Sequence, residues 1–237
     1  MALPKLGYPT FELELPSTGK TIKYRPFLVK EEKVLLMALE SKDEKQVVSA
    51  VKDLIKNCVI TRIKVDNLPS FDLEYLFLKI RGASIGENII LTVTCLDDNE
   101  TQVEANININ DVEIFKPEGH DKIIMFDENT GLVMKYPSMK EFVDREFLQK
   151  EMKTEDVYDF IADSIDQIFD SEEVYDSSTT TKKEFRTFVD SLTTKQFEKI
   201  QKFYETSPKL SHTFKVTNPK TNTESPYTIK GLQSFFA

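Results

Sequence analysis

The chain has 237 residues, of which 40% are hydrophobic and seventeen are phenylalanine, so it is long enough to fold around a sizeable core. Its formal net charge of -9 argues against nucleic acid as the main ligand, because phosphate binding depends on concentrated lysine and arginine. No stretch approaches the run of about eighteen apolar residues that a membrane span needs, and the N-terminus lacks the apolar core of a secretory signal.

The first predicted elements are the two strands of a hairpin. Apolar residues occupy every second position in residues 11–15 and again in residues 22–24, a pattern typical of two strands that share one buried face. Gly19 can adopt the left-handed conformation that a short hairpin loop requires, and Pro16 ends the first strand. We therefore expect a hairpin at the start of the fold.

A helix follows this hairpin almost directly. Pro26 ends the second strand, and the charged residues 30–33 open the helix. The side chains that we expect to face the core are Val34, Leu35, Met37 and Ala38.

Two short motifs in the hairpin resemble functional signals. The triplet Gly19-Lys20-Thr21 resembles the end of a phosphate-binding loop, but Glu14 stands where that motif requires a glycine. Residues 15–19 spell a sortase-type sorting signal, which acts near a C-terminus and before an apolar anchor. Both motifs are better interpreted as a turn.

Two further helices are predicted before residue 90. Ser41 and Glu44 have the spacing of a capping box, which places a second helix at about residues 43–57. Cys58 continues its apolar face, so we interpret it as a core residue, with a reactive thiol as the alternative. A third helix is expected at residues 71–81.

Two more hairpins are predicted in the middle of the chain. The first pairs residues 89–94 with 101–109, and the second pairs 123–126 with 132–136. His120 precedes the second hairpin in a loop, where we expect a solvated side chain rather than a catalytic one. With two histidines and two cysteines outside CxxC spacing, the chain does not suggest a zinc site or a disulfide framework, and a reducing compartment fits best.

From residue 136 onward the pattern becomes mainly helical. A helix with an apolar face at Met139, Phe142, Val143 and Phe147 is expected first, followed by a helix over residues 154–169 that Thr154 caps. On the opposite side of this second helix lie Asp156, Asp159, Asp163, Asp166 and Asp170. Such a row is typical of a solvated face; the alternatives are a docking surface for a basic partner and acid/base catalysis by paired carboxylates.

The remaining elements are helices at residues 183–192 and 194–205 and a hairpin at 212–216 and 227–229. We therefore predict an α+β fold in which several antiparallel β-hairpins combine with a helical C-terminal half, and in which helix content exceeds strand. The predicted division is an α+β region at residues 1–136 and a mainly helical region at 137–237, which could also form one domain. The helix and hairpin near the C-terminus repeat the order of residues 71–109, so an internal repeat is possible.

Three segments carry a resemblance to a known family. PSTGKTIKYRPFLVKEEKVLLMAL, LPSFDLEYLFLKIRGASIGE (Leu68 to Glu87) and the closing GLQSFF (Gly231 to Phe236) occur in the expected order over most of the chain. They resemble the baseplate hub assembly proteins of T-even-type contractile-tailed bacteriophages. The first segment is long and specific, whereas GLQSFF alone would be weak.

The resemblance implies a non-enzymatic protein that acts in assembly of the baseplate hub, as a chaperone or as a hub component. The alternatives are a permanent structural subunit and, more remotely, a carboxylate-dependent hydrolase. Expected partners are other hub and tail proteins, with no nucleic acid, membrane, small-molecule substrate, cofactor or metal. The expected location is the host cytoplasm during assembly, or the baseplate of the virion. Besides the five aspartates, the candidate docking residues are Leu232, Phe235 and Phe236.

Overall fold

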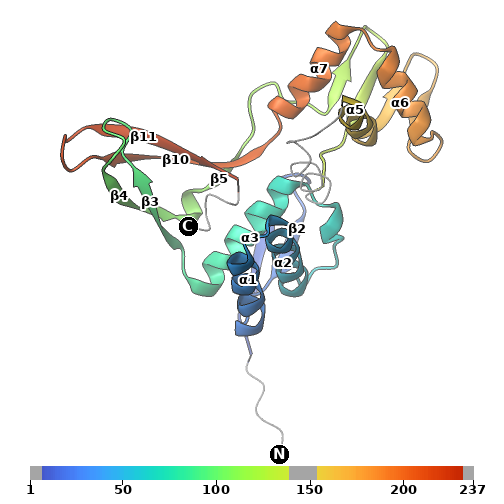
Figure 1. Ribbon diagram of the computed structural model, residues 1–237. Coiled ribbons are helices and arrows are strands. Elements are labelled where there is room, and N and C mark those ends of the chain that lie inside the picture. Colours follow the sequence, from blue (N-terminus) through green and yellow to red (C-terminus); the bar gives the residue numbers. More distant parts are fainter. Residues whose placement is uncertain (1–6, 139–153, 232–237) are drawn as a thin grey trace, which may run out of the picture. The chain divides into compact units, whose positions relative to one another are not determined.

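The computed structural model describes residues 7–138 and 154–231, which divide into two compact units (Figure 1). The first unit combines Met1–Phe115 with Lys209–Ala237, and the second is Lys116–Pro208. The second unit is therefore an insertion into the sequence of the first. The boundary predicted at residues 136 and 137 lies inside the second unit.

The first hairpin forms as predicted. Strands β1 (Phe11–Glu14) and β2 (Thr21–Tyr24) are antiparallel, with Leu13 opposite Ile22. Gly19 has a φ of +66°, the left-handed conformation that the loop requires. The loop is fixed to the third helix, because the buried carboxylate of Asp72 accepts hydrogen bonds from the backbone N–H and the hydroxyl of Ser17.

Three helices complete this part of the unit: α1 (Val29–Ser41), α2 (Glu44–Cys58) and α3 (Ser70–Ile85). The cap of α2 is Asp43 rather than Ser41, because the Asp43 side chain accepts from the N–H groups of Lys45 and Gln46. Helix α3 is apolar on several sides and runs through the centre of the packing. Its buried residues are Phe71, Asp72, Leu73, Leu76, Phe77, Leu78 and Ile80.

The rest of the first unit consists of strands. They are β3 (Asn88–Thr94), β4 (Gln102–Asn108), β5 (Glu113–Phe115), β10 (Lys209–Thr217) and β11 (Glu224–Lys230). The hairpin of β3 and β4 and the hairpin of β10 and β11 were both predicted, and both are confirmed. Strand β10 also pairs with β5, so the C-terminal hairpin extends a sheet that begins about a hundred residues earlier. Leu78 of α3 and Leu210 of β10 belong to one buried cluster with residues of β3 and β4.

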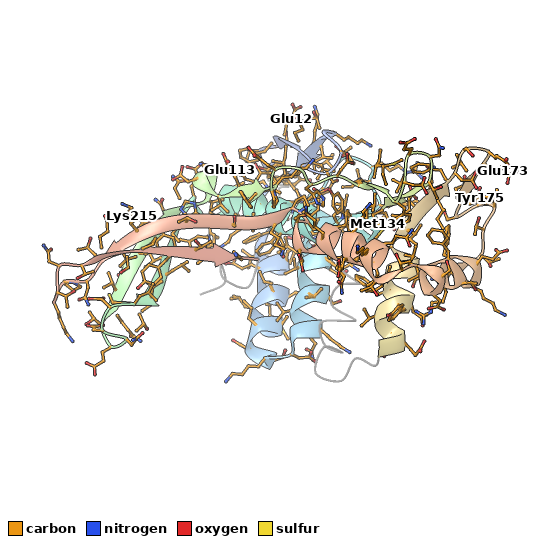
Figure 2. The ribbon with its side chains drawn as sticks, turned by 90° about the horizontal axis from the view of Figure 1, so that it is seen from above. Glu12, Glu113, Met134, Glu173, Tyr175 and Lys215 are labelled. Atoms are coloured by element: carbon orange, nitrogen blue, oxygen red, sulfur yellow. The ribbon has the colours of Figure 1, made fainter. Side chains whose placement is uncertain are left out.

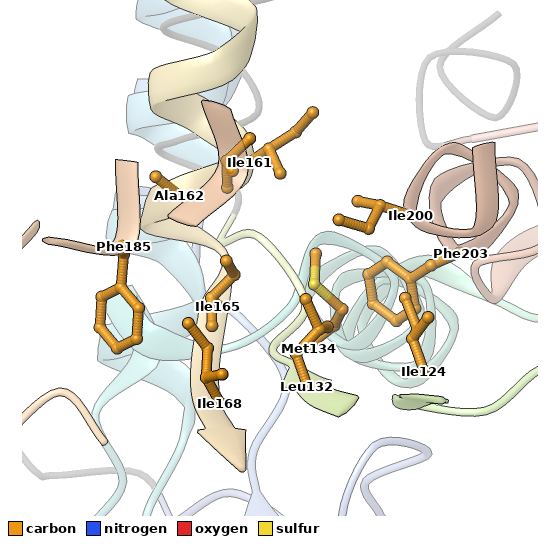
Figure 3. Packing of buried hydrophobic residues seen from close by; sticks show 11 residues of the cluster. Ile124, Leu132, Met134, Ile161, Ala162, Ile165, Ile168, Phe185, Ile200 and Phe203 are labelled. Atoms are coloured by element: carbon orange, nitrogen blue, oxygen red, sulfur yellow. The ribbon is translucent and has the colours of Figure 1, made fainter. Parts of the chain in front are cut away.

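The second unit is a four-stranded antiparallel sheet with helices on one face. Its strands are β6 (Ile123–Met125), β7 (Gly131–Met134), β8 (Ile165–Phe169) and β9 (Val174–Asp176), in that spatial order. Among its described residues, the helices are α5 (Thr154–Asp163), α6 (Lys182–Ser191) and α7 (Thr194–Glu205). Figure 3 shows the core between them, in which Ile200 and Phe203 of α7 lie beside Met134 and Ile124 of the sheet.

The prediction of a helical C-terminal half is wrong. Residues 165–169 were expected to continue the helix that begins at Thr154, but α5 ends at Asp163 and β8 follows. The N–H of Ser164 donates to the carbonyls of Phe160 and Ile161, and the chain then pairs with β7 and β9. Within the described residues 154–231, the chain forms the strands β8 to β11 as well as the helices α5, α6 and α7. The helix predicted with an apolar face at Met139, Phe142, Val143 and Phe147 lies outside the described residues. Over the described residues, helix accounts for 38% and strand for 28%.

Candidate interaction surfaces

The five predicted aspartates do not lie on one helix face. Asp156, Asp159 and Asp163 are on α5, Asp166 is on β8, and Asp170 begins the turn after β8. Helical spacing no longer applies after Asp163, because strand residues alternate between two faces of a sheet. The continuous acidic helix surface is therefore not formed.

Two of these aspartates are paired with basic side chains of α6. Lys182 Nζ lies 2.7 Å from Asp163 Oδ1, and Arg186 Nε lies 3.5 Å from Asp159 Oδ1. Arg186 also contacts Glu155 Oε2 at 2.6 Å. These ion pairs join α5 to α6 and neutralise part of the charge of α5 within the unit. Binding of a partner by the aspartates stays a prediction.

The predicted C-terminal docking residues, Leu232, Phe235 and Phe236, lie outside the described residues. The last described residue, Gly231, has a φ of +70°, and its N–H donates to the carbonyl of Leu210. The docking role of Leu232, Phe235 and Phe236 stays a prediction.

Helix α1 has exposed apolar side chains that the sequence interpretation missed. Val29 is 80% exposed, Met37 is 60% exposed, and Val34 and Leu36 are 53% and 52% exposed. The prediction that Val34 and Met37 face the core is therefore wrong. We call these four side chains the α1 apolar surface. A signal for it was present, because residues 34–39 are all apolar and a helix cannot turn six consecutive side chains toward one core.

A buried ion pair fixes which side of α1 faces inward. Glu31, Leu35 and Ala38 are the buried residues of the helix, at the spacing of one helical stripe. Arg25 Nη2 lies 3.0 Å from Glu31 Oε1, and the N–H of Leu28 donates to Glu31 Oε2 at 2.7 Å. Burial raises the pKa of Glu31, but the hydrogen bonds from Arg25 and Leu28 outweigh it, so that the pKa is below its usual value. Glu31 therefore turns the side of the helix that carries Leu35 and Ala38 inward, which leaves Val34 and Met37 exposed.

The cysteines do not form a reactive site. Cys58 and Cys95 are both buried and free, and Cys58 packs in the core as predicted. Burial raises the pKa of the Cys58 thiol to about 11, so that little thiolate forms near neutral pH. Burial also raises the pKa of Cys95.

His120 is buried, so the prediction of a solvated side chain is wrong. Its Nδ1 lies 2.9 Å from Thr206 Oγ1, and its Nε2 lies 2.9 Å from the hydroxyl of Tyr136. The imidazole also stacks on the ring of Phe203, with ring centres 5.2 Å apart. Since Thr206 Oγ1 donates its own proton to the carbonyl of Lys202, Nδ1–H is the donor and Nε2 accepts from Tyr136. His120 thus joins the start of the second unit to its end.

Within residues 7–138 and 154–231, no group of three or more His, Cys, Asp or Glu side chains is placed to hold a metal ion. In the same ranges, no helix combines the length and the apolar character that crossing a membrane requires.

Comparison with protein families decides the identity. The family model described as T4 bacteriophage base plate protein matches residues 8–237 of the chain. The chain belongs to this family. The match covers both units, and it confirms the resemblance of the three segments to baseplate proteins. No curated protein and no solved structure matched the chain. Membership assigns the protein to the baseplate of a phage tail and implies contact with other tail proteins.

Proposed function

We propose that this baseplate protein acts in assembly of the baseplate hub, in the host cytoplasm, by binding other hub and tail proteins and without catalysis. The observation that carries the proposal is the α1 apolar surface: Val29, Val34, Leu36 and Met37. It lies within the segment that most resembles the hub assembly proteins. A baseplate subunit with a complementary apolar surface is the partner that this helix fits.

The α1 apolar surface favours binding because exposing apolar area to water costs free energy. Covering such area on association stabilises a complex by about 25 cal/mol for each Å² removed from water, before the entropy of association is subtracted. The helix is held in one orientation by Glu31, so the surface is preorganised and loses little freedom on binding. Lys30, Glu32 and Lys33 lie between the apolar residues, which adds polar groups of both signs around the contact.

The proposed role needs no catalysis, and two adjacent carboxylates of the first unit have a structural use. Asp97 and Asp98, in the turn between β3 and β4, both accept hydrogen bonds at 3.0 Å from the side-chain amide of the buried Asn218. Asp97 also accepts from the Thr221 hydroxyl. These hydrogen bonds, with that from Thr221 the strongest influence, hold the pKa of Asp97 below its usual range. The pair therefore remains ionised and fastens one hairpin turn to the other.

Quantitative mass spectrometry of purified virions, beside a pull-down of this chain from infected cells, tests the proposal. We expect the pull-down to recover hub proteins from the lysate whether the chain is an assembly chaperone or a permanent hub component. A fixed ratio to other baseplate proteins in virions would make the chain a permanent hub component, and its absence there would make it an assembly chaperone. Recovery of no hub protein would contradict the proposal.

The α1 apolar surface is tested by Leu36→Lys in the same pull-down. A lysine here adds a charge to the contact without disturbing the core, so we expect recovery of hub proteins to fall by about tenfold or more. Ile60→Lys is the matched control, because Ile60 has the same exposed fraction of 52% and lies in the same unit. Equal recovery by both variants would show that α1 is not the contact.

A further inference from the structure

The sheet of the second unit has a second apolar face, opposite the helices. Strand pairing places Met125, Gly131, Phe169 and Val174 in one row across the four strands and Ile123 opposite Val133 in the next. These side chains alternate with Ile124, Leu132 and Ile168, which belong to the core under the helices. Val174 is 60% exposed, Ile123 51% and Met125 40%. We define the open sheet face as Ile123, Met125, Val133, Phe169 and Val174.

Gly131 makes the Met125–Val174 row continuous. A Cβ atom at Gly131 would lie 2.7 Å from Phe169 Cζ and 3.1 Å from Met125 Sδ, so both side chains lean over the glycine from the neighbouring strands. An aromatic ring that covers a glycine in this way fills the gap in a sheet surface. The Met125–Val174 row is therefore apolar across all four strands. The next row is apolar at Ile123 and Val133 and polar at Gln167 and Asp176.

Acidic side chains border one end of the open sheet face. The turns β6–β7 and β8–β9 leave the sheet next to the Met125–Val174 row, and both are acidic. Their exposed carboxylates, which we call the acidic rim, are Asp127, Glu128, Asp170, Glu172 and Glu173. Asp127 and Asp170 accept backbone N–H bonds within their turns, which hold their pKa values below the usual range. Lys199 lies nearby, and its Nζ donates to the carbonyl of Met125 at 2.6 Å.

We propose that the open sheet face binds a second surface of a tail protein, one with an apolar centre and lysine or arginine side chains opposite the acidic rim. An apolar centre with a charged border is the usual composition of a specific protein interface. Five carboxylates at one edge favour a basic partner through charge complementarity. They disfavour a second copy of this chain, because its rim has the same sign, and they disfavour nucleic acid and anionic membranes for the same reason.

The inference rests on the proposed function, because the partner is taken to be a tail protein. It adds a contact in Lys116–Pro208 to the contact proposed for α1, which lies in the other unit. The two proposals therefore make separate predictions about which variants lose binding.

Zero-length crosslinking with a carbodiimide tests the new contact, because the reagent joins a carboxylate only to an amine in direct contact. The full chain is incubated with individually purified hub and tail proteins of the same phage, and crosslinked peptides are identified by mass spectrometry. We expect links from Glu128 or Glu172 to lysines of one such protein, with a yield that falls in high salt. Links only to another copy of this chain, or to lysines within its own residues 139–153, would overturn the proposal.

Two kinds of variant give independent readouts with the same partner. Val174→Asn places a polar amide on the open sheet face without adding to the acidic rim and should lower the crosslink yield about tenfold. Ile85→Asn, at a similarly exposed apolar position of the first unit, should not. The double variant Glu128→Lys and Glu172→Lys leaves the sheet unchanged and should weaken binding through charge alone. If neither the variant of the open sheet face nor the double variant of the acidic rim changed binding, this inference would be overturned, and the role proposed for α1 would stand. If the unaltered chain captured no tail protein, the proposed function would fail as well.

Discussion

Arg25 and Glu31 are buried charges that depend on each other. Replacing Glu31 with alanine leaves the Arg25 guanidinium buried without its carboxylate, and removing one partner of such a pair typically costs about 3–5 kcal/mol. We expect chemical denaturation of Glu31→Ala to show a loss of unfolding free energy in this range. Glu12→Ala is the control, because its ion pair with Lys23 is exposed on both sides and should contribute at most about 1 kcal/mol. Equal losses in the two variants would contradict the role given to burial.

The imidazole of His120 should make the second unit sensitive to acid. Burial lowers the pKa of His120, and the charges of Lys116 and Lys122 lower it further, while Asp121 raises it. The unfolded state therefore takes up a proton at a higher pH than the folded state does. Stability present above the unfolded value of about 6.5 is lost as the pH falls toward the lower folded value.

Thermal unfolding at pH 7.5 and pH 5.5 measures this loss. We expect the unaltered protein to melt at a lower temperature at pH 5.5 and His120→Gln to show a smaller difference between the two values. The chain has two histidines, so His212→Gln is the natural control and should keep the full difference. If the difference in melting temperature disappeared in His212→Gln and persisted in His120→Gln, the acid sensitivity would not come from His120.

At the scale of elements, Arg186 joins α6 to α5. It contacts Glu155 and Asp159 of α5, and its guanidinium lies 4.8 Å from the centre of the Tyr158 ring. Its side chain is 19% exposed, whereas the side chain of Lys182, which pairs with Asp163, is 84% exposed. We expect Arg186→Ala to destabilise the second unit by about 1–2 kcal/mol and Lys182→Ala by less than about 0.5 kcal/mol, in denaturant titrations. A larger loss of unfolding free energy for Lys182→Ala than for Arg186→Ala would contradict this account of how α5 and α6 are joined.

Gly131 controls the packing of three strands. Alanine there would place Cβ 2.7 Å from the carbonyl oxygen of Ile124, which is backbone and cannot turn aside. Gly131→Ala should therefore destabilise the second unit by about 1–3 kcal/mol, as overpacking does. Gly7→Ala, where nothing lies within 4 Å of the new Cβ, is the control and should unfold as the unaltered chain does. The measurement is urea unfolding of each variant.

At the scale of the whole molecule, the two units should open separately. Both cysteines lie in the first unit and are buried, so a thiol reagent reports on that unit alone. We expect Gly131→Ala to speed proteolysis within residues 116–208 and to leave the rate of thiol labelling unchanged. Leu76→Ala, at a buried position of α3, should speed thiol labelling and leave proteolysis within residues 116–208 unchanged. Thiol labelling that rises with Gly131→Ala would show that the units open together.

The sequence by itself determined the elements whose signals are local. The four predicted hairpins follow from alternating apolar residues beside turn residues. Helices α6 and α7 directly follow Thr181 and Thr193, whose side chains accept hydrogen bonds from the first turn of each helix. The family resemblance was also contained in the sequence, because its segments are continuous.

Tertiary structure decided the features that depend on distant partners. Apolar residues at Ile165, Ile168 and Phe169 fit helical spacing, and they form a strand because β7 and β9 supply hydrogen bonds on both sides. The inward side of α1 was decided by Arg25, a charge outside the helix that must keep Glu31 buried beside it. The pairing of β10 with β5 inserts one unit into the other, and no local pattern encodes a contact between strands so far apart in the chain. Exposed surfaces such as the α1 apolar surface and the open sheet face are what remains once these distant contacts have been made.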